Sequence, residues 1–118
     1  MKSSHELFGR EHRVGWNKLV DDLITDLNKM GTEWTLTQCK EKFGGLRFYA
    51  HNCTPEQYDL IHEYEEKSFI ICEVCGKKGI LREALGWVQT LCWEHYAKEL
   101  ETKMVRLHKL MEQDHNGN

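Results

Sequence analysis

The apolar residues near the start of the chain recur at the spacing of an α-helix. They follow one another at steps of four, three, four and three residues, which places them on one face of a helix covering about 14–30. The residues of this face are Trp16, Val20, Leu23, Leu27 and Met30. Gly31 follows directly, and glycine commonly ends helices because it adopts a positive φ without strain. We expect an amphipathic first helix with this face in the core.

A β-hairpin is predicted next. Segments 34–40 and 46–50 are rich in β-branched and aromatic residues, and they flank a glycine pair at 44–45. This arrangement is typical of two strands joined by a tight turn. Because glycines at a turn let a loop extend from the strands, we expect the loop to project from the surface.

A second helix is predicted to begin at Thr54. Thr54 and Gln57 match a capping box, and Pro55 stands at the first helical position, where its missing N–H group costs nothing. The helix leads toward Phe69 and gives way to Ile70-Ile71.

The last predicted helix, from about Trp93 to Glu112, carries a narrow apolar stripe. Its members follow at steps of four, three, four, three and four, which is the heptad spacing of coiled coils. They are Trp93, Ala97, Leu100, Met104, Leu107 and Met111. We expect this stripe to pack against the first helix. The alternative is a homodimer through the C-terminal helix, because three heptads exceed what one small domain needs. Residues 113–118 are expected to form a polar, fraying tail.

Composition narrows the class of protein. The chain has 118 residues, of which 40% are hydrophobic and 30% charged, as in a single soluble domain. Its 16 basic and 19 acidic residues give a net charge of −3, which argues against a general polyanion binder but leaves room for a local basic patch. No apolar run approaches the roughly 18 residues that a membrane span needs, and the start shows no apolar signal segment. We expect a cytoplasmic protein with no membrane partner.

Four residues of the second half have the spacing of a metal site. Cys72, Cys75, Cys92 and His95 form the pattern C-x2-C-x16-C-x2-H, and Cys3His is a common ligand set for structural zinc. An odd number of cysteines without an export signal favours reduced thiols over disulfides. Four protein ligands would leave no position for a catalytic water, so we expect one structural zinc ion. The alternative is a set of buried thiols beside an incidental histidine.

The local sequence around these ligands predicts a treble-clef-like zinc finger. Gly76 permits the chain to fold back after the first pair, residues 80–84 and 87–91 suit a hairpin that turns at Leu85-Gly86, and the second pair begins a helix. The predicted class is therefore α+β, in one domain over 1–118. Its parts are a helix–hairpin–helix portion at 14–71, the zinc finger with its long C-terminal helix at 72–112, and the tail. Cys39, Cys53 and the other histidines are expected to be ordinary surface or satisfied residues.

Two groups of cations and aromatics are candidate partner-binding residues. The first lies on the predicted hairpin and consists of Lys40, Lys42, Phe43 and Arg47. The second follows the cysteine pair Cys72 and Cys75 and consists of Lys77, Lys78 and Arg82. Such compositions can hold a phosphate or stack a base. The alternative for the hairpin is that its aromatics fill the core and its lysines lie in water.

Several motifs together resemble a family of small uncharacterised proteins from bacteria and their phages. They are Gly-Trp at 15–16, Lys-Glu-Lys-Phe-Gly-Gly-Leu-Arg-Phe-Tyr at 40–49, Cys-Glu-Val-Cys-Gly at 72–76 and Gly-Trp-Val-Gln-Thr-Leu-Cys at 86–92. The likeness covers roughly 14–96, and it implies the same four zinc ligands but no activity. The finger alone is similar to that of DksA/TraR-type transcription regulators, although here the fourth ligand is histidine and no long acidic-tipped hairpin is present.

Three functions are compatible with these features. The first is a non-catalytic, zinc-stabilised binding protein, phage- or prophage-encoded, that acts in the host cytoplasm on a host protein complex as an anti-defence or host-takeover inhibitor. The second is a nucleic-acid-binding transcription regulator that uses the basic-aromatic hairpin. The third is an HNH-like nuclease, which needs a histidine base on the finger hairpin. The segment from Ile80 to Leu91 contains no histidine, so magnesium-dependent nuclease activity should be absent.

Overall fold

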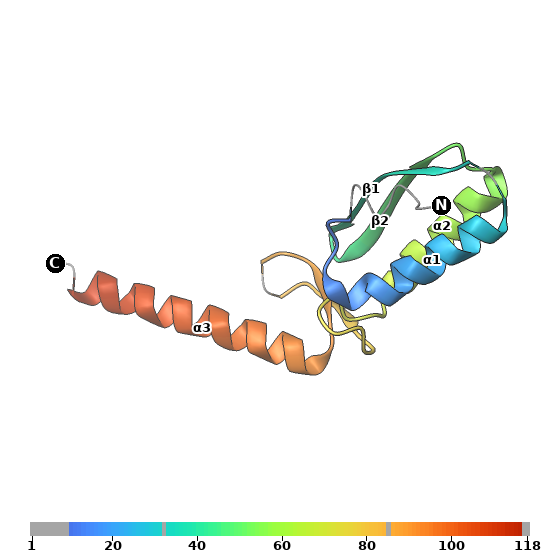
Figure 1. The fold of residues 1–118 in the computed structure, drawn as a ribbon. Helices are drawn as coiled ribbons and strands as arrows, with labels where there is room; N and C mark the ends of the chain where they lie inside the picture. Colours follow the sequence, from blue (N-terminus) through green and yellow to red (C-terminus); the bar gives the residue numbers. More distant parts are fainter. Residues whose placement is uncertain (1–9, 32, 85, 117–118) are drawn as a thin grey trace.

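The structure is a computed structural model that describes residues 10–31, 33–84 and 86–116. Figure 1 shows a body at one end and a helical arm, α3, that leaves it, so that the molecule measures 65 × 25 × 21 Å. The elements in chain order are α1 (Asn17–Lys29) after a 3-10 turn (Val14–Trp16), β1 (Thr35–Lys42), β2 (Gly45–His51), α2 (Pro55–Ser68), β3 (Ile80–Arg82), β4 (Gln89–Leu91) and α3 (Trp93–Asn116). The predicted α+β class and the order of helices and strand pairs are confirmed.

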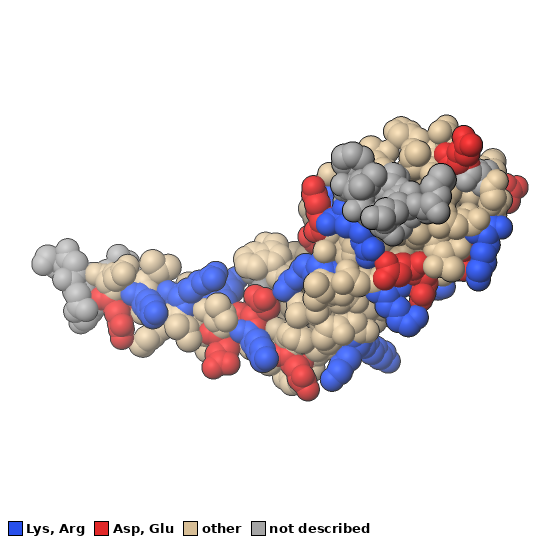
Figure 2. All heavy atoms as spheres, in the orientation of Figure 1, with Lys and Arg blue, Asp and Glu red and all other residues tan. Residues whose placement is uncertain are grey.

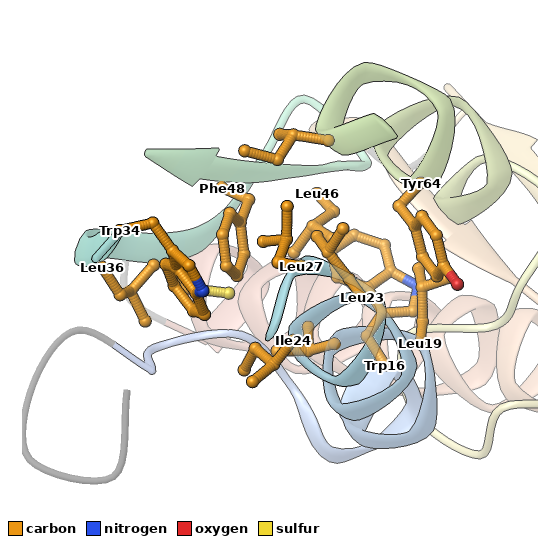
Figure 3. Packing of buried hydrophobic residues seen from close by; sticks show 13 residues of the cluster. Trp16, Leu19, Leu23, Ile24, Leu27, Trp34, Leu36, Leu46, Phe48 and Tyr64 are labelled. Carbon is orange, nitrogen blue, oxygen red and sulfur yellow. The ribbon is translucent and has the colours of Figure 1, made fainter. Parts of the chain in front are cut away.

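The core of the body lies between α1, α2 and the β1–β2 hairpin (Figure 3). The predicted face of α1 supplies much of it, since Trp16, Val20, Leu23 and Leu27 are fully buried. Each such side chain contributes roughly 1.5–3 kcal/mol when it leaves water. Met30 is an exception. It was predicted as the last residue of the buried face but is 41% exposed, because α1 ends at Lys29 and the chain turns at Gly31, with φ of +77°.

The β1–β2 hairpin closes through a two-residue turn at Phe43-Gly44. The two residues have φ values of +53° and +79°, and the ladder pairs Lys42 with Gly45. Positive φ at both positions is characteristic of a type I′ turn. The turn was predicted at Gly44-Gly45. Gly45 instead begins β2, where a Cβ atom would lie 2.4 Å from the ring of Phe69, so its lack of a side chain serves packing.

The start of α2 confirms the predicted capping box. The hydroxyl of Thr54 accepts a hydrogen bond of 3.1 Å from the Gln57 amide, and the Gln57 side chain accepts one of 2.8 Å from the Thr54 amide. Gln57 is fully buried, and its side-chain nitrogen donates to the carbonyl of Leu27 at 3.2 Å. The cap therefore also joins α2 to the last turn of α1.

The expected packing of the C-terminal helix on the first helix is wrong. α3 contacts β4 at its beginning and then runs away from the body (Figure 1). Its stripe is largely uncovered, with Trp93 and Met111 67% and 69% exposed. The helix also continues to Asn116, so residues 113–116 are helical and not a tail, because nothing in their sequence breaks a helix. None of the described helices is long and apolar enough to cross a membrane.

Candidate metal centre

The first ligand pair lies on a turn that hydrogen bonds hold in shape. The amide of Cys72 donates to the carbonyl of Lys77 at 2.7 Å, and the amide of Gly76 donates to the carbonyl of Cys72 at 2.9 Å. Gly76 has a φ of +81°, as its predicted role in folding the chain back requires. This turn directs the thiols of Cys72 and Cys75 toward one point.

The second ligand pair arrives on the strand pair β3–β4 and the first turn of α3. β3 pairs with β4 so that Ile80 lies opposite Leu91, the residue directly before Cys92. The amide of Tyr96 donates to the carbonyl of Cys92 at 2.9 Å, which starts the helix and brings His95 onto the same side as Cys92. The predicted hairpin is thus present but shorter than 80–84 and 87–91, and its predicted turn residue Leu85 lies outside the described residues.

The four side chains have the spacing of a tetrahedral metal site. Their ligand atoms all lie within 4.8 Å of one another. The Nδ1 atom of His95 lies 3.2 Å from the sulfur of Cys92 and 3.7 Å from that of Cys72, and the sulfurs of Cys75 and Cys92 are 3.7 Å apart. A regular tetrahedron with metal–sulfur bonds of about 2.3 Å and a metal–nitrogen bond of about 2.0 Å has edges of about 3.8 and 3.5 Å. The four residues therefore fit one four-coordinate metal ion, and their cysteines are free of disulfides.

The surroundings of Cys72 favour the thiolate form that binds metal. Burial of this thiol opposes its ionisation, but the amides of Cys92, Cys75 and Val74 donate hydrogen bonds to the sulfur. Their combined effect holds the pKa of Cys72 below its usual value. A lowered pKa means that less free energy is needed to deprotonate the ligand when the metal enters.

Glu73 lies between Cys72 and Cys75. It anchors the metal module, by which we mean the turn at Cys72–Gly76, β3, β4 and the first turn of α3, to the body formed by α1, α2 and the β1–β2 hairpin. It is 2% exposed, and its carboxylate accepts hydrogen bonds from the Thr90 amide at 3.0 Å and from Arg13 at 3.1 Å. Its main-chain carbonyl accepts from the Gly15 amide at 2.8 Å. Burial raises the pKa of the Glu73 carboxyl, and the hydrogen bonds from Thr90 and Arg13 oppose that shift. The two hydrogen bonds to the buried carboxylate and the one to the main-chain carbonyl together fix the orientation of the turn at Cys72–Cys75.

Sequence reasoning did not identify this anchor. Glu73 and Arg13 are 60 positions apart, and nothing in their local sequence pairs them. The one available signal was a charged residue within a motif whose cysteines were expected to be buried.

The turn of the β1–β2 hairpin lies on the metal module, so the prediction that it projects from the surface is wrong. The hydroxyl of Thr90 donates to the carbonyl of Gly44 at 2.6 Å. A Cβ atom at Gly44 would lie 2.6 Å from the side chain of Leu81 and 3.2 Å from that of Val88. The glycine is therefore needed for close approach as well as for its φ of +79°.

The predicted partner-binding residues of the hairpin are divided between two places. Phe43 is 68% exposed at the turn, where the ammonium group of the exposed Lys42 lies 5.8 Å from its ring centre. Arg47 is half-buried and lines a groove of about 680 Å³ between β2 and α2, together with Glu65. Lys40 lies opposite Arg47 in the ladder and is also half-buried.

The predicted basic cluster beside the knuckle is only partly available. Lys77 and Lys78 are exposed. Arg82 is half-buried, its guanidinium lies 4.4 Å from the ring centre of Tyr96, and its Nε donates to the carbonyl of Leu91 at 3.3 Å. Arg82 thus holds the base of α3 against β3–β4, a structural role that competes with phosphate binding.

A second cluster of chemically interesting residues, which sequence reasoning missed, surrounds Cys39. The sulfur of Cys39 lies 3.4 Å from Nδ1 of His12, and Nε2 of His12 lies 2.9 Å from the side-chain oxygen of Asn17. Cysteine, histidine and asparagine also form the catalytic group of papain-like proteases. Here, however, Cys39 is fully buried, and burial raises its pKa to about 12. Burial also lowers the pKa of His12. A buried neutral thiol is a poor nucleophile at neutral pH, and Cys39 is part of the core, with His12 and Asn17 at its edge.

Comparisons of the chain with protein families, with curated proteins and with solved structures found no match. The interpretation of the site therefore depends on its geometry. Among the residues that the structure describes, the candidate metal ligands form the single group Cys72, Cys75, Cys92 and His95, and neither Cys39 nor Cys53 belongs to it.

Proposed function

We propose that the protein is a non-catalytic binding protein that one structural zinc ion stabilises. Three thiolates and an imidazole in a tetrahedron bind zinc in preference to the harder cations magnesium and calcium. Four protein ligands complete the coordination of zinc and leave no open position for water. A knuckle, a strand pair and a ligand-bearing helix in this order make a treble-clef finger the interpretation that we favour.

The observation that supports a binding role is the position of Phe43. This aromatic is the central exposed residue of what we call the turn surface, made of Lys42, Phe43 and the half-buried Leu81 and Val88. The hydrogen bond from Thr90 to Gly44 holds the turn on the strand that leads to Cys92. A rigid, exposed aromatic is typical of an anchor in a protein–protein interface. Zinc would thus stabilise the surface without touching the partner.

A protein partner fits the charge distribution better than nucleic acid does. On the face shown in Figure 2, basic and acidic side chains alternate along α3, and no continuous basic stripe marks a path for a phosphate backbone. The exposed Lys77 and Lys78 keep nucleic acid as the second candidate. We propose a host protein complex, met in the host cytoplasm, as the partner.

A capture experiment with matched variants tests this proposal. The intact protein should retain one stoichiometric protein complex from host lysate. Phe43→Ala should weaken that binding by about 2 kcal/mol, roughly 30-fold, without loss of metal. Val14→Ala removes an equally exposed apolar side chain, 70% against 68%, and should bind as the wild type does. Recovery of nucleic acid alone, in a salt-dependent manner, would support the regulator instead.

A further inference from the structure

Among the residues that the structure describes, no element covers most of the apolar stripe of α3. Trp93, Met104, Leu107 and Met111 are exposed, and Ala97 and Leu100 are half-buried. At 1.5 Å per residue the stripe is about 27 Å long. Contiguous apolar surface of this length is rare on monomeric soluble proteins and marks an interaction site. In water, moreover, a helix depends mainly on packing of its apolar face. α3 contacts β4 near its beginning, and farther along it borders only the β3–β4 loop at Gly86 and Trp87 among the described residues.

The dimensions of the chain also indicate missing contacts. Its radius of gyration is 18.2 Å, whereas a compact domain of this length has about 13.5 Å. Its accessible surface is 8012 Å², whereas a compact monomer of this mass exposes about 6,700 Å². The difference, about 1,300 Å², exceeds the roughly 800 Å² that each partner buries in a standard interface. The extended chain as a whole thus exposes more surface than one partner buries in a standard dimer interface.

We propose that α3 pairs with α3 of a second copy of this chain as an antiparallel two-stranded coiled coil. The steps of four and three residues, sustained from Trp93 to Met111, produce a narrow seam that matches another helix better than a broad hydrophobic cleft. The described side chains of α3 also carry no net charge. Over 93–113 the acidic residues are Glu94, Glu99, Glu101 and Glu112, and the basic residues are Lys98, Lys103, Arg106 and Lys109. Two copies can therefore approach without net repulsion.

The sizes of the seam residues favour the antiparallel orientation. In that orientation Leu100 lies opposite Met104 of the second copy, and Ala97, the smallest residue of the seam, lies opposite Leu107. Trp93 then lies opposite the flexible Met111, which can adapt to the indole ring. A parallel pair would instead place Ala97 opposite Ala97 and leave a gap, which costs stability.

The residues that flank the seam form one pair that favours this orientation and one that opposes it. Glu94 would lie beside His108 of the second copy, which is also 3.1 Å from Glu112 of its own helix. Lys103 is directed toward its own chain, where a Cβ atom at Gly86 would lie 3.4 Å from its ammonium group. Glu101 would lie beside Glu101 of the second copy, and this like-charge contact supplies a test of orientation.

The first test is the oligomeric state of the metal-loaded full chain by sedimentation equilibrium. We expect a dimer, and we expect Met104→Glu to weaken it about a hundredfold or more, because each dimer loses two buried methionines. Thr102→Glu is the control, since Thr102 is also exposed, lies on the opposite side of α3 and does not line the apolar surface of the stripe. The metal content and the circular dichroism spectrum of each variant verify that it folds. A monomeric wild type at about 100 µM, or equal weakening by the two variants, would overturn the proposal.

The second test mixes tagged Glu101→Lys protein with untagged wild type. Antiparallel helices would place Lys beside Glu only in the mixed dimer. The fraction of dimers that contain one chain of each kind should therefore exceed the one half expected from random pairing. In a parallel pair Glu101 would lie near Tyr96, and random mixing would result. A mixed fraction of one half would therefore overturn the antiparallel arrangement.

Discussion

The hydroxyl of Thr90 donates a hydrogen bond of 2.6 Å to the main-chain carbonyl of Gly44, and both residues are buried. Thr90 stands two residues before the metal ligand Cys92, and Gly44 directly follows the exposed Phe43. This one contact therefore links the metal site to the surface that we propose for partner binding. Together with the anchor at Glu73, it explains how a ligand set in the second half of the chain can position a turn in the first half.

The close approach at Gly44 predicts an asymmetry between two glycine substitutions. Gly44→Ala and Gly31→Ala both place a side chain at positive φ, +79° and +77°, which costs roughly 1–2 kcal/mol. Only Gly44→Ala also brings a Cβ atom to 2.6 Å from Leu81, whereas a Cβ atom at Gly31 meets nothing within 4 Å. We expect Gly44→Ala to lower the free energy of unfolding by at least about 1 kcal/mol more than Gly31→Ala in denaturant titrations. Equal effects would show that the turn is not tightly seated.

Removal of the Thr90 hydroxyl should destabilise the protein. Thr90→Val leaves the buried carbonyl of Gly44 without this donor, at a cost of roughly 1–3 kcal/mol in the free energy of unfolding. The matched control is Thr102→Val, since the hydroxyl of Thr102 donates to the carbonyl of Lys98 on the exposed side of α3. The control should change stability little. If the two variants unfold at the same denaturant concentration, the contact contributes nothing.

The thiols should differ in reactivity in the metal-loaded protein. Cys39 is fully buried with a pKa of about 12, and the three ligand cysteines are protected by the metal. Cys53 is only half-buried. Although burial raises the pKa of its thiol, the thiol is accessible, so Cys53 should be the one thiol that a disulfide reagent modifies promptly. Chelation should expose the ligand cysteines. The Cys53→Ser variant should show no prompt reaction, and peptide mapping that finds Cys39 modified first would contradict the burial that we describe.

Stability should fall at high pH because of Tyr64. Burial and the hydrogen bond to Asp26 raise the pKa of Tyr64 to about 12, whereas tyrosine in an unfolded chain ionises near pH 10. The folded state thus favours the neutral phenol, so its stabilisation is fully present below about pH 10 and is lost as the pH rises toward 12. Denaturant unfolding of the wild type and of Tyr64→Phe over this range measures the effect. The variant should show the shallower decline, and identical declines would exclude Tyr64 as the cause.

Local sequence predicted much of this fold because local physical chemistry determines those parts. The capping box of Thr54 and Gln57 and the helical spacing of the α1 face require no knowledge of distant residues. The metal cluster was predictable because each ligand pair is local and only one ion has to join the two pairs.

The remaining features depend on contacts between distant segments. The stripe of α3 identifies an apolar face but does not say which surface covers it, and the structure leaves most of it exposed. The glycines at 44–45 indicated a turn. Only the packed structure shows that a side chain at Gly44 would clash with Leu81 and one at Gly45 with Phe69. His12 and Cys39 are brought together by tertiary contacts that neither sequence environment indicates.

The claim on which the account depends most is that Cys72, Cys75, Cys92 and His95 hold one zinc ion. The direct measurement is elemental analysis by mass spectrometry of protein purified without added metal. We predict close to one zinc per chain in the wild type and in the controls Cys39→Ser and Cys53→Ser. Cys75→Ser and His95→Ala should lose the metal and, because binding and folding of the module are coupled, part of their stability. A wild type with a zinc content near zero, or a control that loses zinc while Cys75→Ser retains it, would contradict the account.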